Sequence, residues 1–181
     1  PLLLWVREAG AIAEAGSAYA PGLVSFGIDV SKLLLVGARR RSETLWAAEE
    51  GLKQAGAVVL LDLAARGKPI DLTITRRLAL AAQARGSTAL ALRGDIAGAL
   101  APPPSAAWTR WRITPAPSRS PYRDEIGNPT CHADLIRHRA GGRGKFFLEW
   151  IDGAFRAEAL GGDLAAPAID RSADAPRRAA G

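Results

Sequence analysis

A run of five apolar residues that ends in an acid, Ala57–Asp62, constrains the fold more than any other feature of this chain. A short Val/Leu run of this kind predicts a strand buried in a parallel sheet. Asp62 then stands at the carboxyl end of that strand, where open α/β sheets bind their ligands. In nucleotide hydrolases an acid at this position holds Mg²⁺, together with a Gly-x-x-x-x-Gly-Lys-Ser/Thr loop that cradles the phosphates.

The sequence contains no such phosphate loop. The nearest match is Gly141–Lys145, but Arg139 stands where the first glycine is needed and Phe146 replaces the hydroxyl residue. The segment also lies between two strand-like runs, so we predict a hairpin turn there. A Gly-x-Gly-x-x-Gly dinucleotide fingerprint is absent as well. We therefore expect no enzymatic activity and no cofactor.

Composition limits the class of protein. The 181 residues carry a net charge of +6 and contain one cysteine. One cysteine excludes an internal disulfide framework, and no apolar run approaches the roughly 20 residues of a membrane span, so we predict a cytoplasmic protein. The basic balance suits an acidic partner such as nucleic acid, or equally a solvated surface rich in arginine.

We expect one domain over residues 1–160 and a disordered tail over residues 161–181, where Ala, Pro, Arg and Asp follow no period. The chain has no methionine, even at position 1. This predicts that it begins inside a longer product. Because Leu2–Val6 already has the pattern of a strand, the missing segment is expected upstream.

The first half of the chain alternates strands and helices. Arg7–Gly16 is predicted to be a turn rich in alanine. The predicted strands are Leu2–Val6, Leu33–Val36, Ala57–Asp62 and Thr88–Leu92, and the predicted helices are Tyr19–Phe26, a segment opened by Ser42 and ended by Gly56, and Leu72–Arg85. This alternation is typical of a parallel sheet with helical crossovers.

The pattern changes after residue 93. An Ala/Pro loop over Gly94–Ala106 and a Pro-rich excursion over Pro115–Pro129 separate the remaining elements. Alternating strands are predicted at Ala107–Ile113, His132–Arg139 and Lys145–Trp150. The fold class is therefore α/β, with a parallel sheet and helical crossovers finished by antiparallel strands.

This arrangement, with an acid on the middle strand, resembles the RecA core over about residues 2–151. Tyr19–Leu23 followed by Gly27–Asp29 is similar to the tyrosine-bearing helix and the next step of RecA, and Ala57–Asp62 is similar to its Walker B strand. More narrowly, the chain resembles the ImuA family in the order and spacing of three passages, Leu3–Glu8, Asp71–Leu78 and Leu148–Trp150.

The resemblance implies a RecA-like, SulA-related accessory protein of SOS-inducible, error-prone translesion DNA synthesis that acts through protein contacts. The implied partners are an ImuB-like homologue of Y-family polymerases and an error-prone replicative-type polymerase. Contacts with RecA and weak binding to single-stranded DNA are further expectations. Two alternatives stay open: an ATP-dependent DNA-binding motor with its phosphate loop upstream, and a division inhibitor that captures a polymerising partner.

The resemblance also assigns two acids to positions of the RecA nucleotide site. Glu8 follows the first strand, where RecA keeps its water-activating glutamate, and Asp62 ends the Walker B strand. Without a phosphate loop, both are expected to be vestigial. The alternatives are an exposed turn for Glu8 and, for Asp62, a strand-end acid that caps the next loop.

The loops that contact single-stranded DNA in RecA are reduced here. The first offers Arg66 and Lys68, and the following helix adds Arg76 and Arg77. The second, residues 94–106, has no aromatic residue and no lysine. Stacking on an aromatic ring contributes about 1–3 kcal/mol per base, so we expect binding to be weak and governed by phosphate charge. The alternative is a solvated helix face.

Aromatic residues in the antiparallel half are candidates for partner contacts, because buried aromatics dominate many interfaces. Trp108 and Trp111 are expected to project to opposite faces of their strand, which leaves at least one of them exposed. The full set of candidates is Trp108, Trp111, Phe146 and Trp150. The alternative is that all four fill the core of the protein itself.

Soft metal ligands are few. Cys131, His132 and His138 are the only cysteine and histidine residues in the chain. Neighbours in a strand point to opposite faces, so Cys131 and His132 cannot readily share a metal. We expect no metal site.

Overall fold

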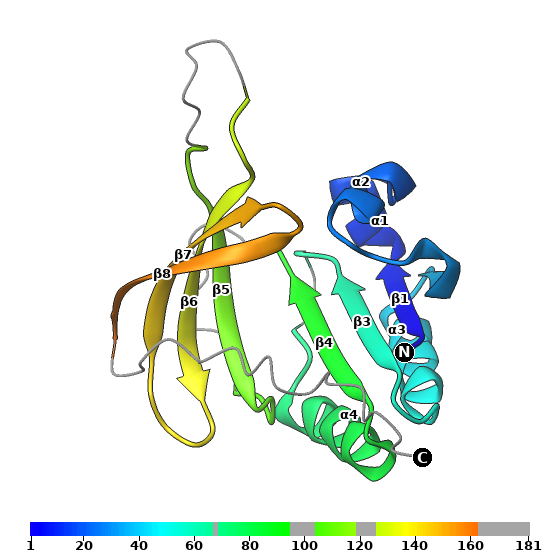
Figure 1. Ribbon diagram of the computed structural model, residues 1–181. Coiled ribbons are helices and arrows are strands. Elements are labelled where there is room, and N and C mark those ends of the chain that lie inside the picture. The colour runs from blue at the N-terminus through cyan, green and yellow to red at the C-terminus, as the bar shows by residue number, and fades with distance from the viewer. Residues whose placement is uncertain (67–68, 95–103, 119–125, 163–181) are drawn as a thin grey trace, which may run out of the picture. The chain divides into compact units, whose positions relative to one another are not determined.

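The computed structural model describes residues 1–66, 69–94, 104–118 and 126–162. The chain divides into a first unit, Pro1–Ala107, and a second unit, Trp108–Gly181. The first unit holds a parallel sheet of four strands, and the second holds an antiparallel sheet of four strands (Figure 1). The predicted α/β class with parallel and antiparallel parts is confirmed, and the antiparallel strands form a sheet of their own.

The parallel sheet has the order β2-β1-β3-β4, so β1 and β3 lie at its centre. All three pairings are parallel. Its strands are β1 (Leu3–Glu8), β2 (Leu33–Ala38), β3 (Val58–Leu63) and β4 (Thr88–Arg93). Each predicted strand is confirmed and extends one or two residues further at its carboxyl end. The central position of β3 follows from its uninterrupted apolar run.

Five short or medium helical elements connect these strands: α1 (Ala9–Ala15), α2 (Ala20–Ser25), the 3₁₀-helix η1 (Val30–Lys32), α3 (Arg41–Leu52) and α4 (Leu72–Arg85). The bounds of α4 agree with the prediction. The side chain of Asp71 accepts a hydrogen bond of 2.8 Å from the backbone N–H of Ile74 and thereby caps the start of α4. Gly86 ends this helix with a φ of 60°, the left-handed conformation that glycine adopts without strain.

Two predictions about the helices are wrong in detail. The segment Arg7–Gly16 contains a helix, α1, where a turn was predicted. Its alanines have the highest intrinsic helix propensity, and Ala11 is buried, so packing stabilises a helix of only seven residues. Helix α3 begins at Arg41 and not after Ser42. The carboxylate of Glu43 accepts hydrogen bonds from the backbone N–H groups of Arg39 and Arg40. These two backbone donors at the start of the helix therefore have a partner.

One face of the parallel sheet is packed against α3 and α4. Its core combines alternate residues of the two central strands with apolar residues of both helices. Leu52 and Leu61 are fully buried there. The buried members of this packed face are Leu4, Val6, Ala48, Leu52, Val59, Leu61, Leu63, Leu78 and Ala82. Trp46, on α3, lies outside this core and is 66% exposed.

The opposite face of the same sheet is apolar but much less covered. The strand register places one residue from each strand side by side across it, Trp5, Leu35, Leu60 and Leu90. Leu35 and Leu90 are each 48% exposed, and Trp5 and Leu60 are half-buried. Leu92, two residues beyond Leu90 on β4, is also exposed. We call these five residues the open face.

The sheet of the second unit runs antiparallel in chain order, from β5 to β8. Its strands are β5 (Thr109–Pro115), β6 (Thr130–His138), β7 (Gly144–Ile151) and β8 (Ala154–Gly162). The predicted hairpin turn between β6 and β7 is confirmed, and Gly141 and Gly142 have φ values of 94° and 90° there. Strand β8 has no predicted counterpart, and the remainder of the predicted tail, 163–181, lies outside the described residues.

The strand register in the second unit bears on the predicted placement of Trp108 and Trp111. Trp108 precedes β5, which begins at Thr109, and the pairing of β5 with β6 shifts between Arg110 and Trp111. Simple alternation therefore does not relate Trp108 to Trp111. A bulge of this kind breaks the period of two on which the prediction of opposite faces depended.

Candidate functional site

Both acids that sequence analysis singled out lie at the carboxyl edge of the parallel sheet, but on its opposite faces: Asp62 follows Leu60 on the open face, and Glu8 follows Val6 on the packed face. Asp62 on β3 lies opposite Arg7 on β1 in the strand register. The Arg7 Nε atom donates to Asp62 Oδ2 at 2.8 Å, and Arg7 Nη1 donates to the carbonyl oxygen of Gly16 at 2.7 Å. Arg7 is only 6% exposed, and its guanidinium carbon lies 4.8 Å from the ring centroid of Trp5. Asp62 is thus the counterion of a buried arginine.

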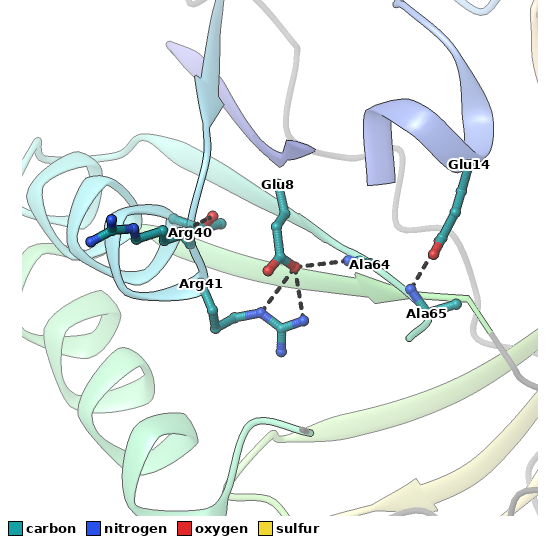
Figure 2. Close-up of polar contacts among 7 residues, drawn as sticks. Glu8, Glu14, Arg40, Arg41, Ala64 and Ala65 are labelled. Atoms are coloured by element: carbon teal, nitrogen blue, oxygen red, sulfur yellow. Dashed lines mark hydrogen bonds and ion pairs between the residues drawn. The ribbon is translucent and has the colours of Figure 1, made fainter. Parts of the chain in front are cut away.

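Glu8, the last residue of β1, is held by a second set of contacts (Figure 2). Its Oε2 atom accepts hydrogen bonds of 3.0 Å from Arg41 Nε and from the backbone N–H of Ala64. Arg41 Nη2 lies 2.8 Å from the same oxygen. In the neighbouring helix α1, Glu14 accepts a 2.9 Å hydrogen bond from the backbone N–H of Ala65. The two glutamates therefore fix the loop that follows β3.

The electrostatics of Glu8 favour its charged form. Burial by itself raises the pKa of the carboxyl group, but the hydrogen bonds from Arg41 and Ala64 and the positive charge of Arg41 lower it by more. The net result is a pKa below the ordinary value for glutamate. Glu8 is ionised at neutral pH and acts as an anchor for α3 and for the loop after β3.

These contacts give both acids structural partners that sequence reasoning missed. Arg7 and Arg41 were not among the predicted residues, and the predicted alternative of an exposed turn for Glu8 is wrong, because its side chain is 13% exposed. The available signal was the placement of Arg7 and Glu8 at a strand end beside a second strand that ends in an acid. Opposite charges at neighbouring strand ends can pair across the sheet.

The predicted nucleic-acid residues that the structure describes are Arg66, Arg76 and Arg77. Arg66 and Arg76 are exposed, and Lys68 lies outside the described residues. Arg77 Nη2 forms an ion pair of 2.6 Å with Glu49, which links α4 to α3. This pair agrees with the alternative of a solvated helix face, at least for Arg77.

The aromatic candidates of the second unit differ in exposure. Trp108 is 59% exposed and Trp111 is 46% exposed. Phe146 is buried in the core of this unit with Ala133 and Leu135, as the core alternative has it. Trp150 is half-buried and stacks edge-on against Phe155 with ring centroids 4.9 Å apart. Trp108 and Trp111 are therefore the two candidates whose side chains are exposed.

Metal ligands and membrane-spanning helices are the next features of the described residues. Within ranges 1–66, 69–94, 104–118 and 126–162, no group of three or more His, Cys, Asp or Glu side chains is arranged to hold a metal ion. Among the helices in these ranges, none has the length and hydropathy needed to cross a bilayer. Burial raises the pKa of the Cys131 thiol, which disfavours its thiolate form.

A pH titration of stability tests the role given to Glu8. Its pKa is lowered in the folded state, so the unfolded chain binds more protons at acidic pH. The stabilisation from Glu8 is therefore complete above the ordinary glutamate pKa of about 4.3 and is lost as the pH falls through the folded value. Glu8→Gln is expected to lower the free energy of unfolding at pH 7, with a difference that shrinks below about pH 4.3. Denaturant unfolding from pH 7 to pH 3 measures this, with the exposed Glu50→Gln as control, and a pH-independent difference would contradict it.

Comparison with known proteins identifies the relatives of this chain. No family model matches it. Two curated proteins do, both called Protein ImuA, from Caulobacter vibrioides strains NA1000/CB15N and ATCC 19089/CIP 103742/CB 15. Each is 35% identical over 153 residues, which cover 79% of this chain and 62% of the relative, so the chain spans about three-fifths of the length of these relatives. Over the aligned residues, the chain belongs to the ImuA family.

Proposed function

We propose that this chain is a non-catalytic accessory protein of damage-inducible, error-prone DNA synthesis that acts through protein contacts. Membership of the ImuA family supports the pathway. The observation that carries the mode of action is the open face, where Leu35, Leu90 and Leu92 are about half exposed on a parallel sheet. Parallel sheets are normally covered on both faces. A contiguous apolar patch on such a sheet is typical of a surface that binds another protein.

The carboxyl edge of the sheet supports the non-catalytic part of the proposal. A RecA-type acid that orients Mg²⁺ or a water molecule needs free oxygen atoms at the ligand site. Here Asp62 neutralises the buried Arg7, and Glu8 is engaged by Arg41 and Ala64. Each acid therefore has a structural role at the edge of the sheet, and this role does not depend on any reaction.

The partners proposed for the open face are an ImuB-like homologue of Y-family polymerases and an error-prone replicative-type polymerase, in the cytoplasm of cells with an active SOS response. RecA is a further proposed partner. An apolar face of half-exposed leucines matches a partner that presents an apolar helix or strand with a polar rim.

Capture from DNA-damaged cells tests the proposal. A tagged copy of this chain is expected to retain the ImuB homologue and polymerase subunits after damage. Recovery of a polymerising cell-division protein in their place would support the division-inhibitor alternative. Purified ImuB that fails to bind the purified chain directly would contradict the proposal.

The chain is also expected to show no ATP hydrolysis above background, because its sequence has no phosphate loop and an arginine already engages one oxygen of each acid, Asp62 Oδ2 and Glu8 Oε2. Release of phosphate from ATP, with and without single-stranded DNA, measures this. The matched variant is Asp62→Asn, checked for folding by circular dichroism. Turnover by the wild type that disappears in a folded Asp62→Asn protein would favour the motor alternative.

A further inference from the structure

Strand β8 is an outer strand of the antiparallel sheet, with β7 on one side (Figure 1). Within the described ranges of the chain, no strand pairs with its other side. Every residue from Ala154 to Leu160 is exposed. An outer strand of this kind presents a row of backbone donors and acceptors to any second strand. The outer edge of β8 is therefore a surface on which another strand can pair.

The turn between β7 and β8 determines which backbone groups lie on this outer edge. Asp152 and Gly153 have φ values of 51° and 78°, and a two-residue type I′ hairpin turn requires both to be positive. The flanking residues Ile151 and Ala154 form a hydrogen-bonded pair, and the pairs then alternate along the two strands. The residues of β8 that bond to β7 are thus Ala154, Arg156 and Glu158. The residues whose backbone groups point outward are Phe155, Ala157 and Ala159.

The charges of β8 are complementary to those of a second β8. The centre of the strand reads Arg156-Ala157-Glu158. When two copies pair antiparallel about a two-fold axis at Ala157, Arg156 of each copy lies opposite Glu158 of the other. Opposite charges at such positions stabilise a strand pair, and like charges destabilise it. One contact therefore forms two opposite-charge pairs.

The backbone pattern selects the same register. Ala157 points outward, so it forms a hydrogen-bonded pair with its own copy, and Phe155 forms one with Ala159 of the second chain. Arg156 and Glu158 then occupy non-hydrogen-bonded positions, where opposite Cα atoms are about 4.5 Å apart and side chains are closest. The nearest registers that keep this pattern are centred one residue away. They place Arg156 opposite itself or Glu158 opposite itself, so the charges reject both.

The contacts of Arg156 within its own chain leave it able to exchange partners. Its Nη2 atom lies 3.8 Å from Asp152 Oδ2, and the two side chains are 69% and 87% exposed. An exposed pair of this kind contributes little to stability. The other outer strand of the sheet, β5, carries two arginines and no acid, so it offers no such complement to itself. Self-complementarity is thus a property of β8 and not of both edges of this sheet.

We propose that β8 pairs antiparallel with β8 of a second copy of this chain, about a two-fold axis at Ala157. The pairing joins the antiparallel sheets of the two copies into one continuous sheet. Regular pairing is short, because a bulge leaves Leu160 without a partner on β7. Stable interfaces bury roughly 1,200–2,000 Å², and a few residues of one strand bury less. The dimer is therefore reversible and forms as the protein concentration rises.

Sedimentation velocity of the full chain over a concentration series tests this contact. The wild type is expected to shift from monomer to dimer as the concentration rises. Arg156→Glu and Glu158→Arg should each weaken dimerisation by about tenfold or more, because two opposite-charge pairs become two like-charge pairs. An equimolar mixture of the two variants should dimerise like the wild type, since each variant then meets the charges that it lacks. No general loss of folding can produce that recovery.

A backbone variant tests the strand pairing itself. Ala157→Pro removes an N–H group that points away from β7, so it breaks no bond within the sheet, and proline is tolerated at such edge positions. It should weaken dimerisation by about tenfold or more, because it removes both hydrogen bonds at the two-fold axis. Circular dichroism should stay like that of the wild type. If this variant unfolds, the mixture of charge variants still decides the question.

Arg143→Glu is the matched control, because it makes the same change of charge at an exposed arginine of the turn between β6 and β7. It should dimerise like the wild type. A wild type that sediments as a monomer throughout the series would overturn the proposal, and so would single charge variants that dimerise as well as the wild type. Capture of ImuB by Arg156→Glu is expected to stay unchanged, because the open face lies on other strands. This readout separates failure of the β8 contact from failure of the proposed function.

Discussion

Asp62→Ala is expected to lower the free energy of unfolding by about 3–5 kcal/mol, the cost of breaking a buried ion pair by removing one partner. The substitution leaves Arg7, which is 6% exposed, without its carboxylate counterion. Arg7 also donates to the carbonyl oxygen of Gly16, but this oxygen carries no full charge. Urea unfolding at neutral pH measures the loss. A loss of this size would identify the acid as structural, in contrast to a metal-binding acid that is dispensable for folding.

The companion variant removes both charges. Arg7→Met/Asp62→Leu is expected to recover most of the stability, because burying no charge costs less than burying one alone. The surface pair between Lys53 and Glu50 provides the control. Its side chains are 63% and 43% exposed, so Glu50→Ala should change stability by about 1 kcal/mol or less. If Asp62→Ala leaves the stability unchanged, Asp62 has no structural role. A role for this acid in a nucleotide site would then have to be tested.

The elements predicted best from the sequence are those in which local signals and burial agree. Helix α4 is capped by the side chain of Asp71 and ends at Gly86, and its bounds agree with the prediction. Strand β3 is apolar throughout except for Asp62, and it lies inside the sheet between two neighbours. In such segments, capping, periodicity and packing all favour the same structure.

The elements that were missed depend on tertiary context. Helix α1 has seven residues, too few to be stable alone, and its formation depends on the burial of Ala11. The pairing of Arg7 with Asp62 joins residues 55 positions apart. Sequence patterns identify both as residues at strand ends, but only the strand order makes them neighbours. For this reason the acids could be placed at the correct edge, as vestigial acids of a nucleotide site, while their arginine partners were missed.

The two faces of the parallel sheet are likewise indistinguishable from sequence. Leu60 and Leu61 are adjacent, apolar and part of one run, yet Leu61 is fully buried beneath the helices and Leu60 lies on the open face. A strand of continuous apolar residues predicts burial on both sides. The structure shows that helices α3 and α4 pack on the same side, which is the feature that creates the open face.

Substitutions on the two faces are expected to have opposite effects on folding and on partner capture. Leu61→Ala should cost about 2–5 kcal/mol, because it removes buried methyl groups and leaves a cavity beneath the helices. Leu35→Gln and Leu90→Gln should each change stability by about 1 kcal/mol or less, since both side chains are half exposed already. Together these two should weaken ImuB binding by at least about thirtyfold, the equivalent of about 2 kcal/mol for one interface hot spot.

Titration calorimetry of purified ImuB against each variant, with thermal unfolding monitored in parallel, separates the two effects. Leu61→Ala should bind ImuB normally at temperatures where it remains folded, because its side chain does not reach the open face. Trp46→Ala serves as the control for an exposed apolar side chain on the other side of the sheet, on α3, and it should retain both properties. If Leu35→Gln/Leu90→Gln binds ImuB like the wild type, the interface lies elsewhere, and the exposed Trp111 of the second unit becomes the next residue to replace. If the same variant unfolds, the open face is a packed surface, and the physical basis for a docking role on this sheet disappears.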